Sequence, residues 1–241
     1  MDGRVIGIAA IVRDETQFVE IPAGWFWMGW EDGLPDARPR HRVWMDAFAI
    51  ARCPVTTAEY GVYLGATGTA PPRFWTDPRF SDPQQPVVGI SWTQAAAFCD
   101  WLTRETKHPH RLPTEAEWER AARGGLEGAR YAWGDESPTR WFGQVRGALA
   151  APPAVGSGPT NGFGLTDLAG AVHEWCLDWY ADDAYARAPD RNPTGPPAGT
   201  RRVSRGGAWR HHDPWSPVAH RSSLPPHLRY SDYGFRVVRA R

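Results

Sequence analysis

Residues Arg111–Gly125 read RLPTEAEWERAARGG, and this stretch contains every signal needed for one short helix. Thr114 stands three residues before Glu117, which is the spacing of a capping box: the threonine hydroxyl and the glutamate carboxylate each accept a hydrogen bond from the other residue's backbone N–H. Gly124-Gly125 can adopt the left-handed conformation that ends many helices. The apolar side of the helix is formed by Trp118, Ala121 and Ala122. We therefore expect the helix to pack through this one face.

Two further capping boxes precede this helix in the chain. Thr56 with Glu59 predicts a short helix that ends near Gly65, and Ser91 with Gln94 predicts a second helix. In that second helix, the residues expected to face the core are Ala95, Phe98, Cys99 and Leu102. Cys99 is therefore expected to serve packing.

Extended segments are expected around these helices. Residues 18–30 contain two apolar pieces joined by a Pro-Ala-Gly turn, which predicts a pair of strands, and residues 42–50 predict another extended run. Residues 173–180 alternate strictly, as a strand requires. Two closing strands are expected around residues 202–204 and 235–238. Together with the helices, these segments predict an α+β fold with long loops.

Composition favours a compact, loop-rich protein. The 241 residues include 25 Gly, 23 Pro and 14 Trp, so loops are frequent but many rings are available for burial. Because no linker-like or repeated segment interrupts the chain, we expect an N-terminal extension at residues 1–16 and a single domain at residues 17–241.

Charge and hydropathy narrow the possible partners and location. Lys and Arg together number 27, as do Asp and Glu, so no net field would attract nucleic acid or an anionic membrane. The apolar run at residues 5–12 is too short to cross a bilayer. The three cysteines are expected to be buried thiols. These features predict a cytoplasmic protein that binds neither nucleic acid nor membrane.

Short motifs occur in a set order on both sides of the helix at residues 111–125. They are Pro22-Ala23-Gly24, Met28-Gly29, Pro54-Val55-Thr56-Thr57, Ser91-Trp92, Trp133-Gly134, Asn161-Gly162-Phe163-Gly164-Leu165, Glu174-Trp175, Arg205-Gly206-Gly207 and Gly234-Phe235-Arg236. In this order they resemble the formylglycine-generating-enzyme-like family, also called the sulfatase-modifying-factor family. The resemblance implies a C-type-lectin-like fold with little regular secondary structure. The family contains copper enzymes, iron enzymes and binding proteins, so the resemblance leaves the activity open.

The copper site of the family is not expected in this chain. In the copper-dependent members, two cysteines after the Arg-Gly-Gly motif hold the metal, because Cu(I) is soft and prefers thiolates. The corresponding residues 209–223 read WRHHDPWSPVAHRSS and contain no cysteine. Copper binding and formylglycine generation by the copper route are therefore not expected.

Three histidines in the same segment offer another type of ligand. His211, His212 and His220 could bind copper, iron or zinc through imidazole. Since neighbouring residues of an extended chain point to opposite sides, only one of His211 and His212 is expected to join His220. The alternative is that all three line a surface loop as ordinary polar groups.

The resemblance also implies a structural calcium ion. Its ligands would be backbone and carboxylate oxygens of Ala169, Gly170, Val172 and Glu174. Two residues depart from the family pattern there, since Ala171 and His173 replace the usual Asn and Trp. Alternatively, Glu174 pairs with a buried arginine such as Arg221 or Arg236, because a buried carboxylate needs a metal or a cation.

Two functional hypotheses follow. In the first, the chain is a binding or regulatory module that displays residues 208–233 to a protein or peptide. Its contact residues would be Trp209, His211, His212, Trp215, His220, Tyr230 and Tyr233. In the second, the chain is an oxidoreductase or oxygenase of the same family, with a metal held by His211 or His212 together with His220.

Overall fold

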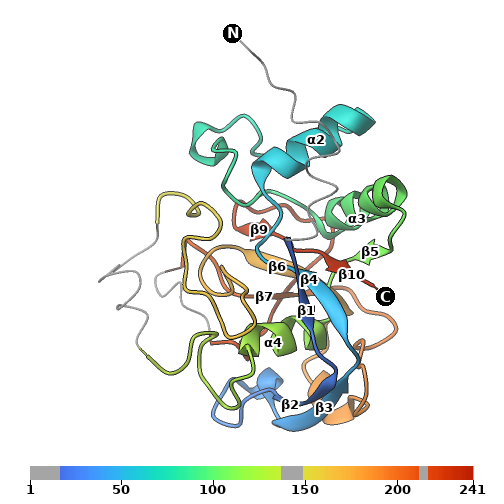
Figure 1. The fold of residues 1–241 in the computed structure, drawn as a ribbon, viewed down its shortest axis with the longest axis vertical. Helices are drawn as coiled ribbons and strands as arrows, with labels where there is room; N and C mark the ends of the chain where they lie inside the picture. The colour runs from blue at the N-terminus through green and yellow to red at the C-terminus, as the bar shows by residue number, and fades with distance from the viewer. Residues whose placement is uncertain (1–16, 137–148, 212–216, 241) are drawn as a thin grey trace.

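The computed structural model describes residues 17–136, 149–211 and 217–240, and these residues form small sheets, short helices and long loops (Figure 1). The first sheet has the order β1 (Phe18–Ile21), β4 (Phe48–Ala51), β10 (Val238–Arg239), β5 (His110–Arg111). The second pairs β2 (Gly24–Met28) with β3 (His41–Met45). The third has the order β8 (Ser222–Leu224), β7 (Arg202–Arg205), β6 (His173–Trp179), β9 (Tyr233–Gly234). The α+β, loop-rich prediction is confirmed.

The helices are short and lie around these sheets. They are η2 (Pro35–Ala37), α2 (Thr57–Thr67), η3 (Pro78–Phe80), α3 (Trp92–Thr106), α4 (Glu115–Arg123) and α6 (Ala184–Arg187). All three predicted capping boxes are present, at the N-termini of α2, α3 and α4. Helix α2 ends two residues beyond the predicted Gly65, at Thr67, and is followed by a left-handed C-cap at Gly68, where φ is +66°. Gly65 has open space around it, so nothing there forces the helix to stop.

Helix α4 is buried on every side, and the prediction of one packed face was therefore incomplete. All nine of its residues are buried, including three glutamates and two arginines. The apolar residues contact the core, while the charged residues face arginines and backbone carbonyls from other elements. Figure 1 shows α4 below β7 and above the β2–β3 pair.

Two strand predictions need correction. Residues 18–30 do form two strands, but β1 pairs with β4 and β2 pairs with β3, so the turn at residues 22–24 connects two different sheets. Of the closing strand predicted at residues 235–238, only Val238 lies in a strand, at the start of β10, and β9 ends at Gly234. Phe235 and Arg236, between them, are fully buried, and Arg236 pairs with Glu174 on β6.

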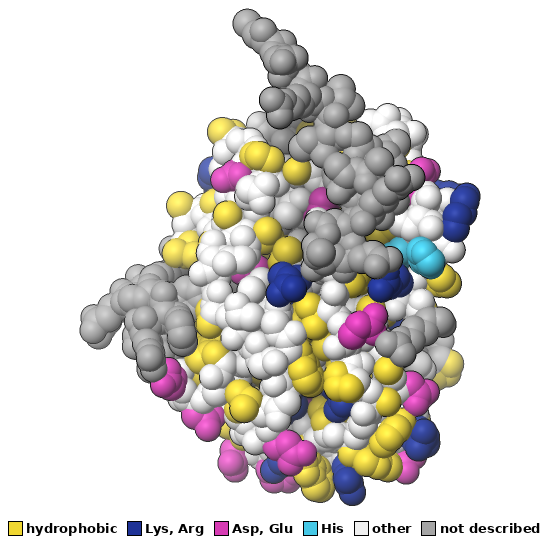
Figure 2. Space-filling view, in the orientation of Figure 1, with side chains coloured by type: hydrophobic (Ala, Val, Ile, Leu, Met, Phe, Trp, Pro, Cys, Tyr) yellow, Lys and Arg dark blue, Asp and Glu magenta, His cyan; other side chains and the backbone are white. Residues whose placement is uncertain are grey.

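The surface carries mixed charge. Figure 2 shows Lys, Arg, Asp and Glu side chains interspersed over the face in view, with no large region of one sign. Two predicted core thiols, Cys99 and Cys176, are buried, and Cys53 is half-buried. Among the helices that the structure describes, none has the length and apolar character needed to cross a bilayer.

Candidate metal centre

Two imidazoles and one carboxylate converge near β9. Nε2 of His173 lies 3.3 Å from Nε2 of His211, and Nε2 of His211 lies 3.9 Å from Oδ2 of Asp232. One potential ligand atom from each of the three residues falls within 4.8 Å of the other two. Two histidines and one carboxylate form a donor set that first-row transition metals prefer.

The backbone explains why these residues meet. Strand β6 pairs with β9 in parallel, with His173 opposite Tyr233, and the His173 N–H donates to the carbonyl of Asp232 at 2.8 Å. The loop that leads to His211 runs beside the start of β6, because the Trp209 N–H donates to the carbonyl of Ala171. Three segments distant in sequence are thereby fixed next to one another.

His173 is fixed in place and neutral. Only 5% of its surface is exposed, and its ring stacks on that of Tyr233 with a centroid distance of 4.8 Å. Burial, together with the nearby His211, His220 and Arg210, lowers the pKa of His173 to about 3. Its Nδ1 atom is buried and forms no hydrogen bond within the described part of the chain. Neutral imidazole is the form that binds metals.

Asp232 contributes a carboxylate with one free oxygen. Its exposed fraction is 2%, and Oδ2 accepts from Nε of Arg210 at 2.8 Å. Oδ1 is buried and has no hydrogen-bond partner among the described residues. Burial raises the pKa of Asp232, and the Arg210 guanidinium opposes that shift. A buried carboxylate oxygen without a donor favours occupancy by a cation.

The spacing of the two imidazoles agrees with cis ligation. Two nitrogens bound at about 2.1 Å to one metal, at angles between octahedral and tetrahedral, lie about 3.0 to 3.4 Å apart. The observed Nε2 separation of 3.3 Å falls in that range. The 3.9 Å distance between His211 and Asp232 is measured to Oδ2, the oxygen that accepts from Arg210, and it does not describe the position of Oδ1. The His211 side chain is 37% exposed, which leaves one side of the site open to solvent.

Of the residues predicted to bind a ligand, some lie at the candidate metal centre and others lie elsewhere. His211 belongs to the metal cluster, whereas His220 does not. Tyr230 is 39% exposed, whereas Tyr233 is buried against His173. His212 and Trp215 lie outside the described residues.

The prediction that Trp209 is displayed to a partner is wrong. Trp209 is 5% exposed and packs in a core cluster with Phe80, Val88 and Val172. Its indole N–H donates to the carbonyl of Ser231 at 3.1 Å. The ring therefore attaches the loop to the body of the protein.

Sequence reasoning missed His173 and Asp232 as members of the site. For His173 there was a signal, since it stands where the resembled family usually has tryptophan. That departure was interpreted only as weakening the calcium site. For Asp232 there was none, because its position beside His173 depends on a parallel strand pair between residues 60 positions apart.

Comparisons with known proteins show which family the chain belongs to. A family model described as the sulfatase-modifying factor enzyme 1-like domain matches residues 9–241. The chain belongs to this family. A formylglycine-generating enzyme from Streptomyces coelicolor is 36% identical across 96% of this chain and 92% of its own length. The serine/threonine-protein kinase pkn1 of Chlamydia pneumoniae is 35% identical across 93% of this chain, which spans 38% of that protein.

Two solved structures share the formylglycine-generating-enzyme-like fold. PvdO from Pseudomonas aeruginosa superposes with a TM-score of 0.79 and 30% identity, over 93% of this chain and 94% of that one. The Treponema denticola variable protein 1 gives a TM-score of 0.79 and 27% identity, over 92% and 94%. Relatives in this family therefore carry the names of a formylglycine-generating enzyme, a serine/threonine-protein kinase and a variable protein, so membership of the family does not fix the activity of this chain.

The copper site implied by the sulfatase-modifying-factor family does not fit these residues. The three cysteines of the chain lie in separate parts of the fold, with Cys99 in α3 and Cys176 in β6. Burial raises the pKa of the Cys53 thiol to about 12 and raises that of Cys176 well above its ordinary value. Protonated thiols in separate elements cannot form a two-thiolate Cu(I) site.

For Glu174, the structure describes the arginine partner that the sequence left open. Glu174 is fully buried, and its oxygens accept from Nε and Nη2 of Arg236 at 2.6 and 2.7 Å. The indole N–H of Trp118 donates to Oε2 at 2.7 Å. Both carboxylate oxygens are therefore engaged by protein donors. Calcium at Ala169, Gly170, Val172 and Glu174 stays a prediction.

Proposed function

We propose that this chain is a metal-dependent oxidoreductase of the sulfatase-modifying-factor family, with its metal held by His173, His211 and Asp232. The observation that carries the proposal is the convergence of two imidazoles with a buried, partly unpartnered carboxylate. A structural zinc site closes its coordination with four protein ligands, whereas three ligands leave positions open for other molecules. The proposal replaces His212 and His220 of the sequence hypothesis with His173 and Asp232.

The donor set suits redox chemistry. Iron or another first-row metal held by His173, His211 and Asp232 would supply redox chemistry and would leave coordination positions open. In the simplest balanced reaction, an organic substrate loses two electrons and two protons, and dioxygen takes them up as hydrogen peroxide. The substrate would approach from the side of His211, which is the exposed member of the three.

The surrounding residues would orient the ligands. Tyr233 stacks on His173 and fixes the plane of its ring, while Arg210 holds Oδ2 of Asp232 and leaves Oδ1 available. Such outer contacts govern ligand orientation in metal sites. Their presence supports a preorganised site.

The binding-module hypothesis is the alternative. Two of its seven contact residues, Trp209 and Tyr233, are buried, so the aromatic surface it requires is smaller than expected. Failure to bind a metal would favour this alternative.

Metal titration tests the proposal. Purified, metal-free protein is titrated anaerobically with Fe(II), and separately with Cu(II) and Zn(II), while bound metal is measured by elemental analysis. We expect one metal per chain, with the affinity reduced at least about 100-fold in His211→Ala and in Asp232→Asn. His227→Ala is the matched control, because His227 is an exposed histidine of the same C-terminal region, and it should bind metal as the wild type does.

A second measurement separates an open site from a closed one. Nitric oxide added to the Fe(II) protein should produce the electron paramagnetic resonance signal of an iron–nitrosyl adduct, which requires a free coordination position. Metal binding that is unaffected by both variants, or iron that does not react with nitric oxide, would refute the oxidoreductase proposal.

A further inference from the structure

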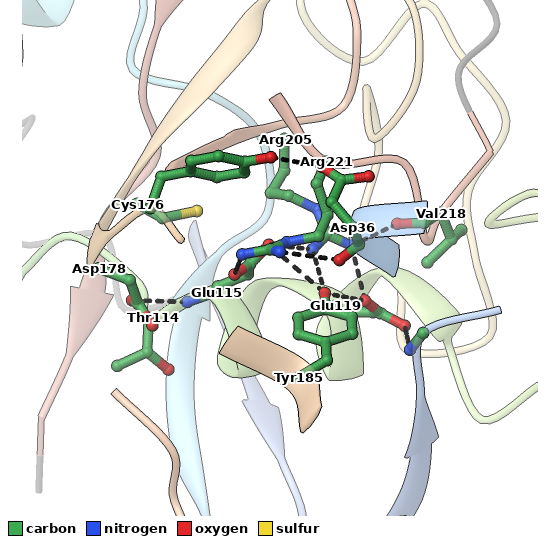
Figure 3. A network of polar contacts seen from close by, with 12 residues as sticks. Asp36, Thr114, Glu115, Glu119, Cys176, Asp178, Tyr185, Arg205, Val218 and Arg221 are labelled. Atoms are coloured by element: carbon green, nitrogen blue, oxygen red, sulfur yellow. Dashed lines mark hydrogen bonds and ion pairs between the residues drawn. The ribbon is translucent and has the colours of Figure 1, made fainter. Parts of the chain in front are cut away.

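A network of buried ion pairs surrounds the N-terminus of α4 (Figure 3). Glu115 accepts from Nη1 of Arg205 and from Nε of Arg221, both at 2.7 Å. Glu119 accepts from Nη2 of Arg205 and Nη2 of Arg123, both at 2.6 Å. Each of these two carboxylates thus has two guanidinium partners, which lower the pKa of each and keep it ionised.

Asp178, in the same region, lacks such a partner. It is 4% exposed, and Oδ2 accepts from the backbone N–H of Glu115 at 2.9 Å. It forms no ion pair with the described residues. Burial, followed by the negative charge of Glu115, raises the pKa of Asp178 to about 8. Within residues 17–136, 149–211 and 217–240, this buried acid is therefore without a directly paired cation.

A cavity of about 300 Å³ lies against Asp178. Its wall combines Met28 and several alanines with the proline-rich segment 189–197, and Asp178, Glu115 and Tyr185 provide its buried polar groups. Volumes near 300 Å³, apolar walls and a few convergent polar groups are typical of small-molecule sites. Since Glu115 and Tyr185 already bond within the network, Asp178 is the group left to bind a ligand.

The proline-rich segment that closes the cavity approaches Asp178 at Gly195, which has no side chain to cover the carboxylate. Gly195 has a φ of +69°, and a Cβ there would lie 3.0 Å from Cβ and 3.2 Å from Oδ1 of Asp178. The Cβ atom of any other residue at position 195 would therefore crowd this oxygen. Arg187 at the cavity wall forms an ion pair with Asp183, which reduces its repulsion of a second cation.

We propose that this cavity binds a small apolar amine in its ammonium form, with the nitrogen paired to Asp178 and the hydrocarbon part against the alanine and proline wall. A buried carboxylate beside apolar surface is stabilised by a cation that brings its own apolar body. Glu115 and Glu117 are already paired with arginines, so Asp178 is the acid at the cavity that a bound cation would neutralise. The site shares no residue with the metal centre, so it stands independently of the proposed oxidoreductase activity.

The charges that face Asp178 come from several elements. Glu115 and Glu117 on α4 raise its pKa, and Arg221 lowers it. Asp178 also interacts with Arg111 on β5 and with Arg202 on β7, and with the thiol of Cys176 on its own strand. At pH 7 the acid is mainly protonated, so pairing with an ammonium group must release a proton.

Calorimetry with 2-phenylethylammonium tests the proposal, with 2-phenylethanol as the neutral analogue. Titrations at pH 7 in two buffers of different ionisation enthalpy give the number of protons released. We expect the amine to bind at least tenfold more tightly than the alcohol and to release close to one proton, with release falling towards zero at pH 9. Asp178→Asn should remove the preference for the amine and the proton release while leaving the weak affinity for the alcohol.

A cavity-filling variant checks the location. Ala188→Phe, at a partly exposed position of the cavity wall, should abolish binding of both compounds without altering Asp178. Equal affinity for the amine and the alcohol, an unchanged amine affinity in Asp178→Asn, or no binding of either compound at millimolar concentration would overturn the proposal. Loss of metal binding would leave this result unaffected, so the two proposals fail separately.

Discussion

From the sequence, Glu174 could be interpreted either as a calcium ligand or as the partner of a buried arginine. Its carboxylate lies at the centre of three donors, two from Arg236 and one from Trp118, at distances of 2.6 to 2.7 Å. The sequence could predict that a buried glutamate needs a metal or a cation, but it could not decide between them. The decision depends on where Arg236 lies, and the irregular segment before β10 determines that position.

Removing the charge of Glu174 should be costly. In Glu174→Gln the guanidinium of Arg236 stays buried without a counter-charge, and breaking a buried pair in this way costs about 3 to 5 kcal/mol of unfolding free energy. Urea unfolding at constant pH measures the loss. Asp77→Asn is the matched control, because its pair with Arg79 is solvent-exposed, and the change should cost less than about 1 kcal/mol. Similar losses in the two variants would contradict this assignment of Glu174.

His173 and His211 illustrate a second limit at the residue scale. His211 was predicted as a candidate ligand because it lies in the segment where the family binds copper. His173 looked like one member of an alternating strand, and alternation predicts only which side of a sheet a residue faces. The stacking with Tyr233 and the contact with His211 arise from neighbouring segments, which local patterns do not specify.

At the scale of elements, the sequence predicted where helices begin, because capping boxes are local. It did not predict which strands pair, because the partners are far apart in the chain. The three capping boxes are formed by residues three positions apart, so the sequence contains all the information needed. The pairing of β1 with β4 joins residues about 30 positions apart, and the parallel β6–β9 pair joins residues 60 apart. Helix α4 was predicted correctly as a helix, yet its burial on all sides depends on arginines contributed by β7 and by the segment before β8.

Two glycines provide a test of packing between elements. A Cβ at Gly162 would lie 2.3 Å from the carbonyl oxygen of Gly124, which ends α4, so Gly162→Ala must separate two backbone segments. We expect it to lower the unfolding free energy by about 2 kcal/mol or more. Gly65→Ala, in α2 with no atom within 4 Å of the new Cβ, should instead raise it by about 0.5 to 1 kcal/mol.

Thermal or urea unfolding of the two alanine variants checks this prediction. Both glycines are exposed to solvent, so surface exposure alone would predict that both substitutions are tolerated. A neutral effect of Gly162→Ala would show that the loop at residue 162 can move away from α4. Such movement would also weaken the contact between Asn161 and the last turn of that helix, where its side-chain amide donates to the carbonyl of Ala121.

Over the whole molecule, buried charge is concentrated around one helix. Carboxylates on α4 and arginines from later strands connect the β2–β3 pair to the sheet that contains β6 and β7. Arg205, Arg221 and Arg236 each form a buried ion pair with a glutamate, whereas the sequence suggested only that Arg221 or Arg236 could pair with Glu174. It did not indicate that Asp178 would remain without a cation, because that depends on how the arginines are shared among the acids.

The unpaired Asp178 should make the stability of the whole protein depend on pH above neutrality. Its pKa is about 8 in the folded state and near 3.8 in the unfolded state, so the folded chain binds one more proton between these values. Stability therefore decreases as pH rises through this window, by up to about 1.4 kcal/mol per pH unit, and levels off above the folded pKa. Glu119 has a pKa of about 2 in the folded state, so it affects the free energy of unfolding only in acid. There its stabilising contribution is lost as the pH falls.

Below about pH 6.5, buried His173 makes the free energy of unfolding rise with pH, which is opposite to the effect of Asp178. The reason is that its pKa in the folded state is about 3, so protonation favours the unfolded chain. Buried thiols act at the upper end, because burial raises the pKa values of Cys53, Cys99 and Cys176 in the folded state, whereas thiols of the unfolded chain ionise near pH 8.5 to 9. The effect of Asp178 is therefore read as the difference between the wild type and Asp178→Asn. In urea unfolding from pH 7 to 9, the free energy of unfolding should fall more steeply for the wild type than for Asp178→Asn between pH 7 and 8, since the amide retains an acceptor for the Glu115 N–H and has no charge to acquire. A wild-type profile without this slope, or the same slope in both proteins, would mean that Asp178 is already ionised at neutral pH and has a cationic partner.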